Sequence, residues 1–309
     1  MTTRSLRMTL AVLVLAVLAA SPPAAAQRPA VDMASLLNIP FYPDAGGFDA
    51  RNILLLFPPA GADVRLALTD PAGHILHEVP FEVRPADVAP VFAYLNVNSR
   101  YGDRQSFAPG EPGDYILSVT VDGEAVGSVP FTLAVERSAD PFAPGATWTA
   151  EGPWQRLAYL AQPTERPEES IGFDYWVSSR EVGNRTASLS LSLRRGGEEV
   201  ARSRSNVHLS TAGLTFFQDH ELAKPGDGVT LWPFTATDLA ATDGRYELVV
   251  LSSGTPIRTY VVTVEGGRIR PHPQSALDYE PRAGFLSPRL LRTGNSTHTV
   301  DAWWVEVAD

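Results

Sequence analysis

Two similar segments, residues 113–135 and 244–265, constrain the fold of this chain more than any other feature. They align at one constant offset, which places Gly113 on Gly244 and repeats a tyrosine, a leucine and a valine at the same alternate positions. An ancestral duplication is the economical explanation for such self-similarity. Independently formed β-hairpins, which are common, are the alternative.

The periodicity within these segments is that of half-buried strands. Tyr115, Leu117 and Val119 alternate with smaller or polar residues, which places them on one face of a strand. Asp122-Gly123 then predicts a tight hairpin, because a type I′ turn needs positive φ at both central residues. Long amphipathic helical patterns are lacking, and residues 154–160 suit either a short helix or a strand. Short strands with Gly and Pro turns between them predict an all-β, antiparallel fold.

The start of each segment carries a resemblance to known domains. Pro112-Gly113-Asp114-Tyr115 and Asp243-Gly244-Arg245-Tyr246 are similar to the turn and tyrosine that open the penultimate strand of immunoglobulin-like and fibronectin-type-III-like β-sandwiches of bacterial exported proteins. The resemblance implies two tandem sandwiches, each with a tyrosine that is hydrogen-bonded to the backbone across a corner. It carries over no active-site residue.

The N-terminus has the pattern of a secretory signal. Arg4 and Arg7 precede an apolar stretch at residues 8–20, and the small residues 24–26 resemble a cleavage site. The stretch is too short to span a bilayer, so we expect cleavage after Ala26 and no transmembrane segment afterwards, with a retained signal anchor as the alternative. An exported chain with no Cys suits a bacterial periplasm or the medium.

These patterns divide the chain into six parts. We expect a signal peptide at 1–26, a lead-in at 27–47, a first sandwich at 48–137, a linker at 138–145, a second sandwich at 146–267 and an extended tail at 268–309.

Composition and motifs exclude several kinds of function. Hydrophobic residues at 44% can fill a core, which excludes a disordered chain, and the formal net charge of -10 argues against binding nucleic-acid phosphates. The common nucleotide, hydrolase and zinc motifs do not occur in the sequence. We therefore expect no cofactor, no metal site and no catalytic residues. His220 is interpreted as a histidine of a surface loop.

The tail combines arginines with a final aromatic pair. Its arginines include Arg282, Arg289 and Arg292, and a strand over residues 299–307 would place Trp303 and Trp304 on opposite faces. Because two exposed indoles are costly, we expect this strand to be covered by the protein itself or by a partner. The tail is thus either a partner-binding arm or a clasp on its own second domain.

The remaining aromatics supply a second candidate site, at which sugar rings would stack. Its members gather in or beside the expected second sandwich: Trp154, Tyr159, Trp176 and Trp232. The competing interpretation is that they form the core of a sandwich. Trp176 alternates with Asp174, so either Trp176 faces outward or Asp174 is unusually covered.

Three functions remain open. The first is a non-enzymatic exported protein that acts as a binding or assembly module of the cell envelope, with an envelope protein or polysaccharide as partner. The second is a carbohydrate-binding protein that uses the aromatics above. The third is a hydrolase with an unrecognised site, which would need clustered carboxylates in a cleft between the domains.

Overall fold

The described residues fold mostly into antiparallel strands, which confirms the predicted all-β class. The computed structural model describes residues 29–31, 33–37, 41–42, 47–48, 53–56, 59–81, 92–95, 111–137, 146–182, 187–208, 215–226, 231–272, 290–293 and 296–308. The expected signal peptide and the expected linker lie outside these residues. Within them, no helix has the length and apolar character needed to cross a membrane.

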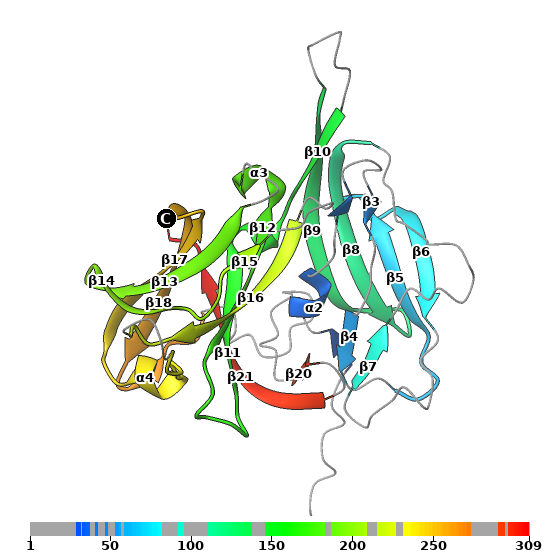
Figure 1. Cartoon of the computed structure of the whole chain (residues 1–309). Helices are drawn as coiled ribbons and strands as arrows, with labels where there is room; N and C mark the ends of the chain where they lie inside the picture. The colour runs from blue at the N-terminus through cyan, green and yellow to red at the C-terminus, as the bar shows by residue number, and fades with distance from the viewer. Residues whose placement is uncertain are drawn as a thin grey trace, which may run out of the picture.

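The first lobe is built on a five-stranded sheet of order β10-β9-β8-β5-β6 (Figure 1). Its strands are β5 (Val64–Thr69), β6 (Ile75–Phe81), β8 (Gly113–Val121), β9 (Glu124–Arg137) and β10 (Ala146–Glu151). The lobe also contains a small sheet of order β1-β4-β7, a helix and a short hairpin. These elements are β1 (Ala30–Val31), α2 (Met33–Leu37), β2 (Phe41–Tyr42), β3 (Gly47–Phe48), β4 (Ile53–Leu56) and β7 (Phe92–Leu95).

The second lobe is one long sheet of order β19-β18-β17-β13-β14-β16-β12-β11-β21-β20, with β15 beside β13. Its strands are β11 (Leu157–Pro163), β12 (Gly172–Ser178), β13 (Ser188–Arg195), β14 (Glu198–Ser203), β15 (Val207–His208), β16 (Thr215–Ala223), β17 (Gly244–Ser252), β18 (Thr255–Glu265), β19 (Arg268–Ile269), β20 (Leu290–Thr293) and β21 (Ser296–Glu306). Its helices are η2 (Pro153–Gln155), α3 (Ser179–Val182) and α4 (Ala236–Ala240). A bridge between Tyr260 and Val307 joins β18 to the chain just after β21, so the sheet curls back on itself.

The two lobes repeat one four-stranded module in register. In the first lobe the order is β6-β5-β8-β9, and in the second it is β14-β13-β17-β18. Each module has two β-bulges, and they fall at equivalent places. One follows Leu68 in the pair β5–β6 and Leu193 in the pair β13–β14. The other follows Val119 in the pair β8–β9 and Val250 in the pair β17–β18. Since bulges are specific local features, their coincidence supports the internal repeat seen in the sequence.

The turn and the tyrosine of each module also coincide. Tyr115 donates a hydrogen bond of 2.7 Å to the carbonyl of Glu111, and Tyr246 donates one of 2.8 Å to the carbonyl of Thr242. Asp122 has a φ of 51°, followed by Gly123 at 84°, as the predicted type I′ turn requires. The tyrosine hydrogen bond that the sequence resemblance implies is therefore present in both modules.

The boundary between the lobes differs from the expected one. β10 follows the expected linker at residues 138–145, yet it pairs along its whole length with β9 of the first lobe. Those residues therefore join two neighbouring strands of one sheet rather than two domains. At the N-terminal side, β1 lies in the expected lead-in but pairs with β4 of the first lobe. The first lobe therefore extends beyond residues 48–137 at both ends.

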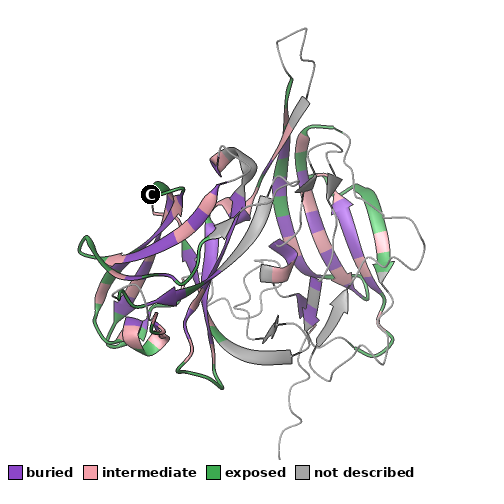
Figure 2. Ribbon diagram, viewed as in Figure 1, coloured by how far each residue is buried: buried purple, intermediate pink, exposed green. Residues whose placement is uncertain are grey.

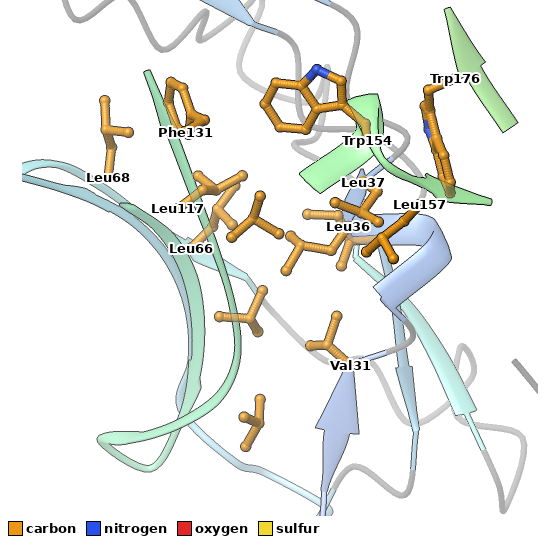
Figure 3. Close-up of a cluster of buried hydrophobic side chains, with 14 of the residues drawn as sticks. Val31, Leu36, Leu37, Leu66, Leu68, Leu117, Phe131, Trp154, Leu157 and Trp176 are labelled. Carbon is orange, nitrogen blue, oxygen red and sulfur yellow. The ribbon is translucent and has the colours of Figure 1, made fainter. Parts of the chain in front are cut away.

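A shared layer of three strands, β12-β11-β21, connects the lobes and contributes buried side chains to a core on each of its faces. One face contributes Leu157 and Tyr159 to an inter-lobe core that includes Leu117 and Phe131 of the first lobe. The opposite face contributes Ala158 and other residues to a separate second-lobe core. Figure 3 shows Trp154, Leu157 and Trp176 facing first-lobe side chains across the inter-lobe core. The lobes therefore meet through a continuous apolar interior.

Three aromatic side chains form a row across the inter-lobe face of this shared layer. Tyr159 on β11 lies directly opposite Trp304 on β21, with ring centroids 5.2 Å apart. Trp176 on β12 lies diagonally from Tyr159, at 6.2 Å. Directly opposite and diagonal cross-strand pairs of this kind stabilise antiparallel sheets. The row therefore ties the C-terminal strand to the middle of the molecule.

Replacing Trp304 with alanine should lower the free energy of unfolding by about 3–5 kcal/mol, because a 2% exposed indole is removed from the inter-lobe core. Chemical denaturation followed by far-UV circular dichroism measures this loss. Trp232→Ala is the matched control: its side chain is 65% exposed, and we expect a change within about 0.5 kcal/mol. Equal losses in the two variants would contradict the buried role of β21.

Candidate functional site

The four aromatics of the predicted sugar-stacking site do not share one surface. Trp154, Tyr159 and Trp176 are at most 4% exposed and belong to the inter-lobe core. A sugar ring cannot reach them because first-lobe side chains cover that face. Trp232 is the exception, with 65% of its surface exposed. The structure therefore corrects the predicted platform, of which one exposed indole remains.

The sequence left two arrangements open for β12: either Trp176 faces outward or Asp174 is covered. The structure has the second arrangement. Phe173 and Tyr175 face the second-lobe core, while Trp176 faces the inter-lobe core. Asp174 shares the face of Trp176 and is 4% exposed, so it is the covered aspartate that the sequence left open. Both faces of the strand are buried because the first lobe packs on the face that would otherwise be in water.

The described end of the tail is a strand of the second lobe. β21 pairs with β11 over seven register positions and with β20 on its other side. Trp304 lies in the inter-lobe core and Trp303 packs against the second-lobe core, as the predicted alternation requires. Arg292 lies on β20, opposite Thr297. Arg282 and Arg289 fall outside the described residues. This end of the chain therefore has the arrangement of a clasp.

A buried polar cluster lies inside the second lobe, beside α3. The guanidinium of Arg258 donates 2.7 Å and 2.6 Å hydrogen bonds to the carbonyl of Trp176 and to Oη of Tyr260, and it forms an ion pair with Glu181. The side chain of Arg258 is 5% exposed and that of Glu181 is 29% exposed. No local pattern in the sequence indicates this cluster, because its members come from α3, β12 and β18.

Two tyrosines of the cluster stay protonated at neutral pH. Burial raises the pKa of Tyr260 to about 12, although the neighbouring Arg258 opposes this rise. Burial also raises the pKa of Tyr175, whose hydroxyl lies 3.2 Å from Nε2 of His220. His220 is 3% exposed, so the interpretation of it as a surface-loop histidine is wrong. Neutral phenols and a paired guanidinium suit a role in holding the lobe together.

Exposed apolar side chains mark a different region, the β5–β6 hairpin. Ile75 is 60% exposed and Leu76 is 43% exposed, and both lie on β6 at the edge of the five-stranded sheet. Figure 2 shows β6 as a largely exposed strand. Sequence reasoning missed this pair, although two adjacent apolar residues break the alternation of a half-buried strand.

Trp232 lies elsewhere, in the connection between β16 and α4. Its carbonyl accepts a 2.9 Å hydrogen bond from the amide of Lys224. The ammonium of Lys224 lies 2.7 Å from a carboxylate oxygen of Asp238, the N3 residue of the capping box of α4. The main chain of Trp232 thus lies next to Lys224, and its exposed indole belongs to the surface of the second lobe.

No group of three or more potential metal ligands occurs among the residues that the structure describes. Comparison with protein families, curated proteins and solved structures finds no match for this chain.

The ion pair of Arg258 and Glu181 predicts an asymmetric mutational result. Arg258→Ala should lower the free energy of unfolding by about 3–5 kcal/mol, since it removes a buried charge that holds α3 and the end of β12. The double variant Arg258→Met with Glu181→Leu should recover part of this loss, because no unpaired charge is left, although the carbonyl of Trp176 and Oη of Tyr260 lose a donor. Denaturant unfolding of each variant provides the comparison.

Arg65→Ala is the control for this test, because Arg65 pairs with Asp63 and Glu78 at a surface where its own side chain is 41% exposed. Its loss should cost about 0–1 kcal/mol. A double variant that is as unstable as Arg258→Ala would show that the cluster is not held by its charges.

Proposed function

We propose that this protein is a non-enzymatic exported protein of a bacterial envelope, in which two immunoglobulin-like lobes form a rigid binding or assembly module. The observation that carries the proposal is the contrast between interior and edge. The described interior is occupied mainly by apolar side chains, together with the buried Asp174 beside Trp176 and a polar cluster in which Arg258 is paired with Glu181. The largest exposed apolar side chains lie on an edge strand and on a loop.

The shared layer supports a module that presents surfaces at a fixed geometry. Because β12, β11 and β21 contribute buried side chains to a core on each face, the two lobes cannot rotate about their contact without exposing Trp176 and Trp304. A rigid scaffold lowers the conformational entropy that is lost on binding. The sequence adds the expected export signal and the absence of Cys.

The exposed indole of Trp232 favours a second candidate, carbohydrate binding. A single exposed aromatic face can stack on a sugar ring. The hydrolase hypothesis has less support, because the described side chains between the lobes form an apolar core rather than a cleft lined by carboxylates.

The proposed function is tested by two measurements: the cell fraction that contains the protein, and the binding of an envelope component to the immobilised protein. The exported protein should begin at Gln27 in the periplasm or medium, as N-terminal sequencing of each cell fraction would show. When immobilised, the folded protein should retain one envelope component saturably, and the same protein in solution should compete for it. The heat-unfolded protein is the control.

Two results would contradict the proposal. One is a cytoplasmic chain that keeps residues 1–26. The other is retention of an envelope component that an excess of the soluble protein does not reduce. Titration with soluble glycans separates the second candidate. Quenching of tryptophan fluorescence that Trp232→Ala abolishes would favour carbohydrate binding over a protein partner.

A further inference from the structure

Comparison of the two modules shows a difference between their outer strands, β6 and β14, in the strands that pair with them. β6 in the first lobe corresponds to β14 in the second, because each is the outer strand of the repeated module and each has its bulge at the same point. β14 pairs on its far side with β16, through Arg202 and Ser203. Among the described residues, β6 pairs with β5 alone.

The residues of β6 also differ from those at the equivalent positions of β14. Thr69 pairs with Ile75, as Arg194 pairs with Glu199, so exposed Ile75 occupies the position of a glutamate. Further along the strand, His77 is exposed where its equivalent, Ala201, is fully buried. At the position of Ile75 the first lobe thus places an apolar residue in water where the second lobe has a charged one, and exposed Leu76 lies next to it, which marks an interaction surface.

Charge and backbone chemistry restrict what fits this edge. The hairpin carries three carboxylates, Asp63, Asp70 and Glu78, against the single guanidinium of Arg65, which contacts Asp63 and Glu78, so its carboxylates outnumber its guanidinium groups. An edge strand also offers a row of main-chain donors and acceptors. Pro80 has no N–H, which confines this row to the residues before it.

We propose that β6 accepts an extended peptide segment of a partner protein, which adds antiparallel as a further strand beside residues 75–79. Its apolar side chains cover Ile75 and Leu76, and basic residues at its ends lie near the carboxylates of the hairpin. This strand takes the place that β16 has beside β14 in the second lobe. The inference rests on the proposed function as a binding module, and it names the surface and the kind of partner.

The test uses a capped synthetic peptide of sequence RVTVTVR and the purified protein. Its binding should slow amide hydrogen exchange at residues 76–79 by at least about tenfold at saturation, because a new strand orders and covers this edge. The same peptide with every amide nitrogen methylated keeps the charges and side chains but cannot form the ladder, so it should give no protection.

The paired variants Ile75→Thr and Leu76→Thr, introduced together, keep strand propensity but remove the apolar contact. They should weaken peptide binding about tenfold or more, in line with the apolar area removed. Val200→Thr changes the residue of β14 that is equivalent to Leu76, and it should bind the peptide as the unchanged protein does.

Three results would overturn the proposal: no protection of β6 by the peptide, equal protection by the methylated peptide, or protection of β6 that grows with protein concentration alone. The last would assign the edge to a second copy of this chain. If the peptide does not protect β6 but the immobilised protein still retains an envelope component, the proposed function is kept and its binding surface lies elsewhere. If the peptide binds β6 and no envelope component is retained, the surface stands without the proposed function.

Discussion

The packing of one three-stranded layer against a core on each of its faces is the constraint on which the rest of the structure depends. On β21, Trp304 faces the inter-lobe core while Val305 faces the second-lobe core. A strand with large apolar residues on both faces is stable only between two packed layers. The first lobe supplies the second covering layer, which explains why Asp174 is buried beside Trp176.

The same module serves the two lobes differently. In the second lobe, β14 continues into β16 and the sheet closes on itself through Tyr260 and Val307. Position 258 carries an arginine that reaches α3, whereas its counterpart in the first lobe, Gly127, leaves room for Val31: a Cβ added at Gly127 would lie 2.9 Å from the Cβ of Val31. One repeated template thus yields a closed lobe and a lobe whose outer strand β6 pairs, among the described residues, with β5 alone. The proposed binding surface follows from that difference.

Local patterns in the sequence predicted the parts of the fold that depend on local chemistry. The turn at Asp122-Gly123, the paired tyrosines and the alternation of Trp303 and Trp304 need only neighbouring residues, and the structure has all three. Predictions that depended on distant contacts fared less well. The proline-containing segment 138–145 resembles a linker but joins two paired strands, and the aromatics at 154, 159 and 176 are covered by a lobe that the sequence does not place there. The Arg258–Glu181 pair spans 77 residues, so no local signal indicates it.

Differential scanning calorimetry tests the central claim, that the shared layer makes the two lobes one cooperative unit. If both lobes depend on β12, β11 and β21, the protein should unfold in a single transition whose calorimetric and van't Hoff enthalpies agree. Two separable transitions, each with the enthalpy of one lobe, would show that the lobes are stable independently and would contradict this account of the fold.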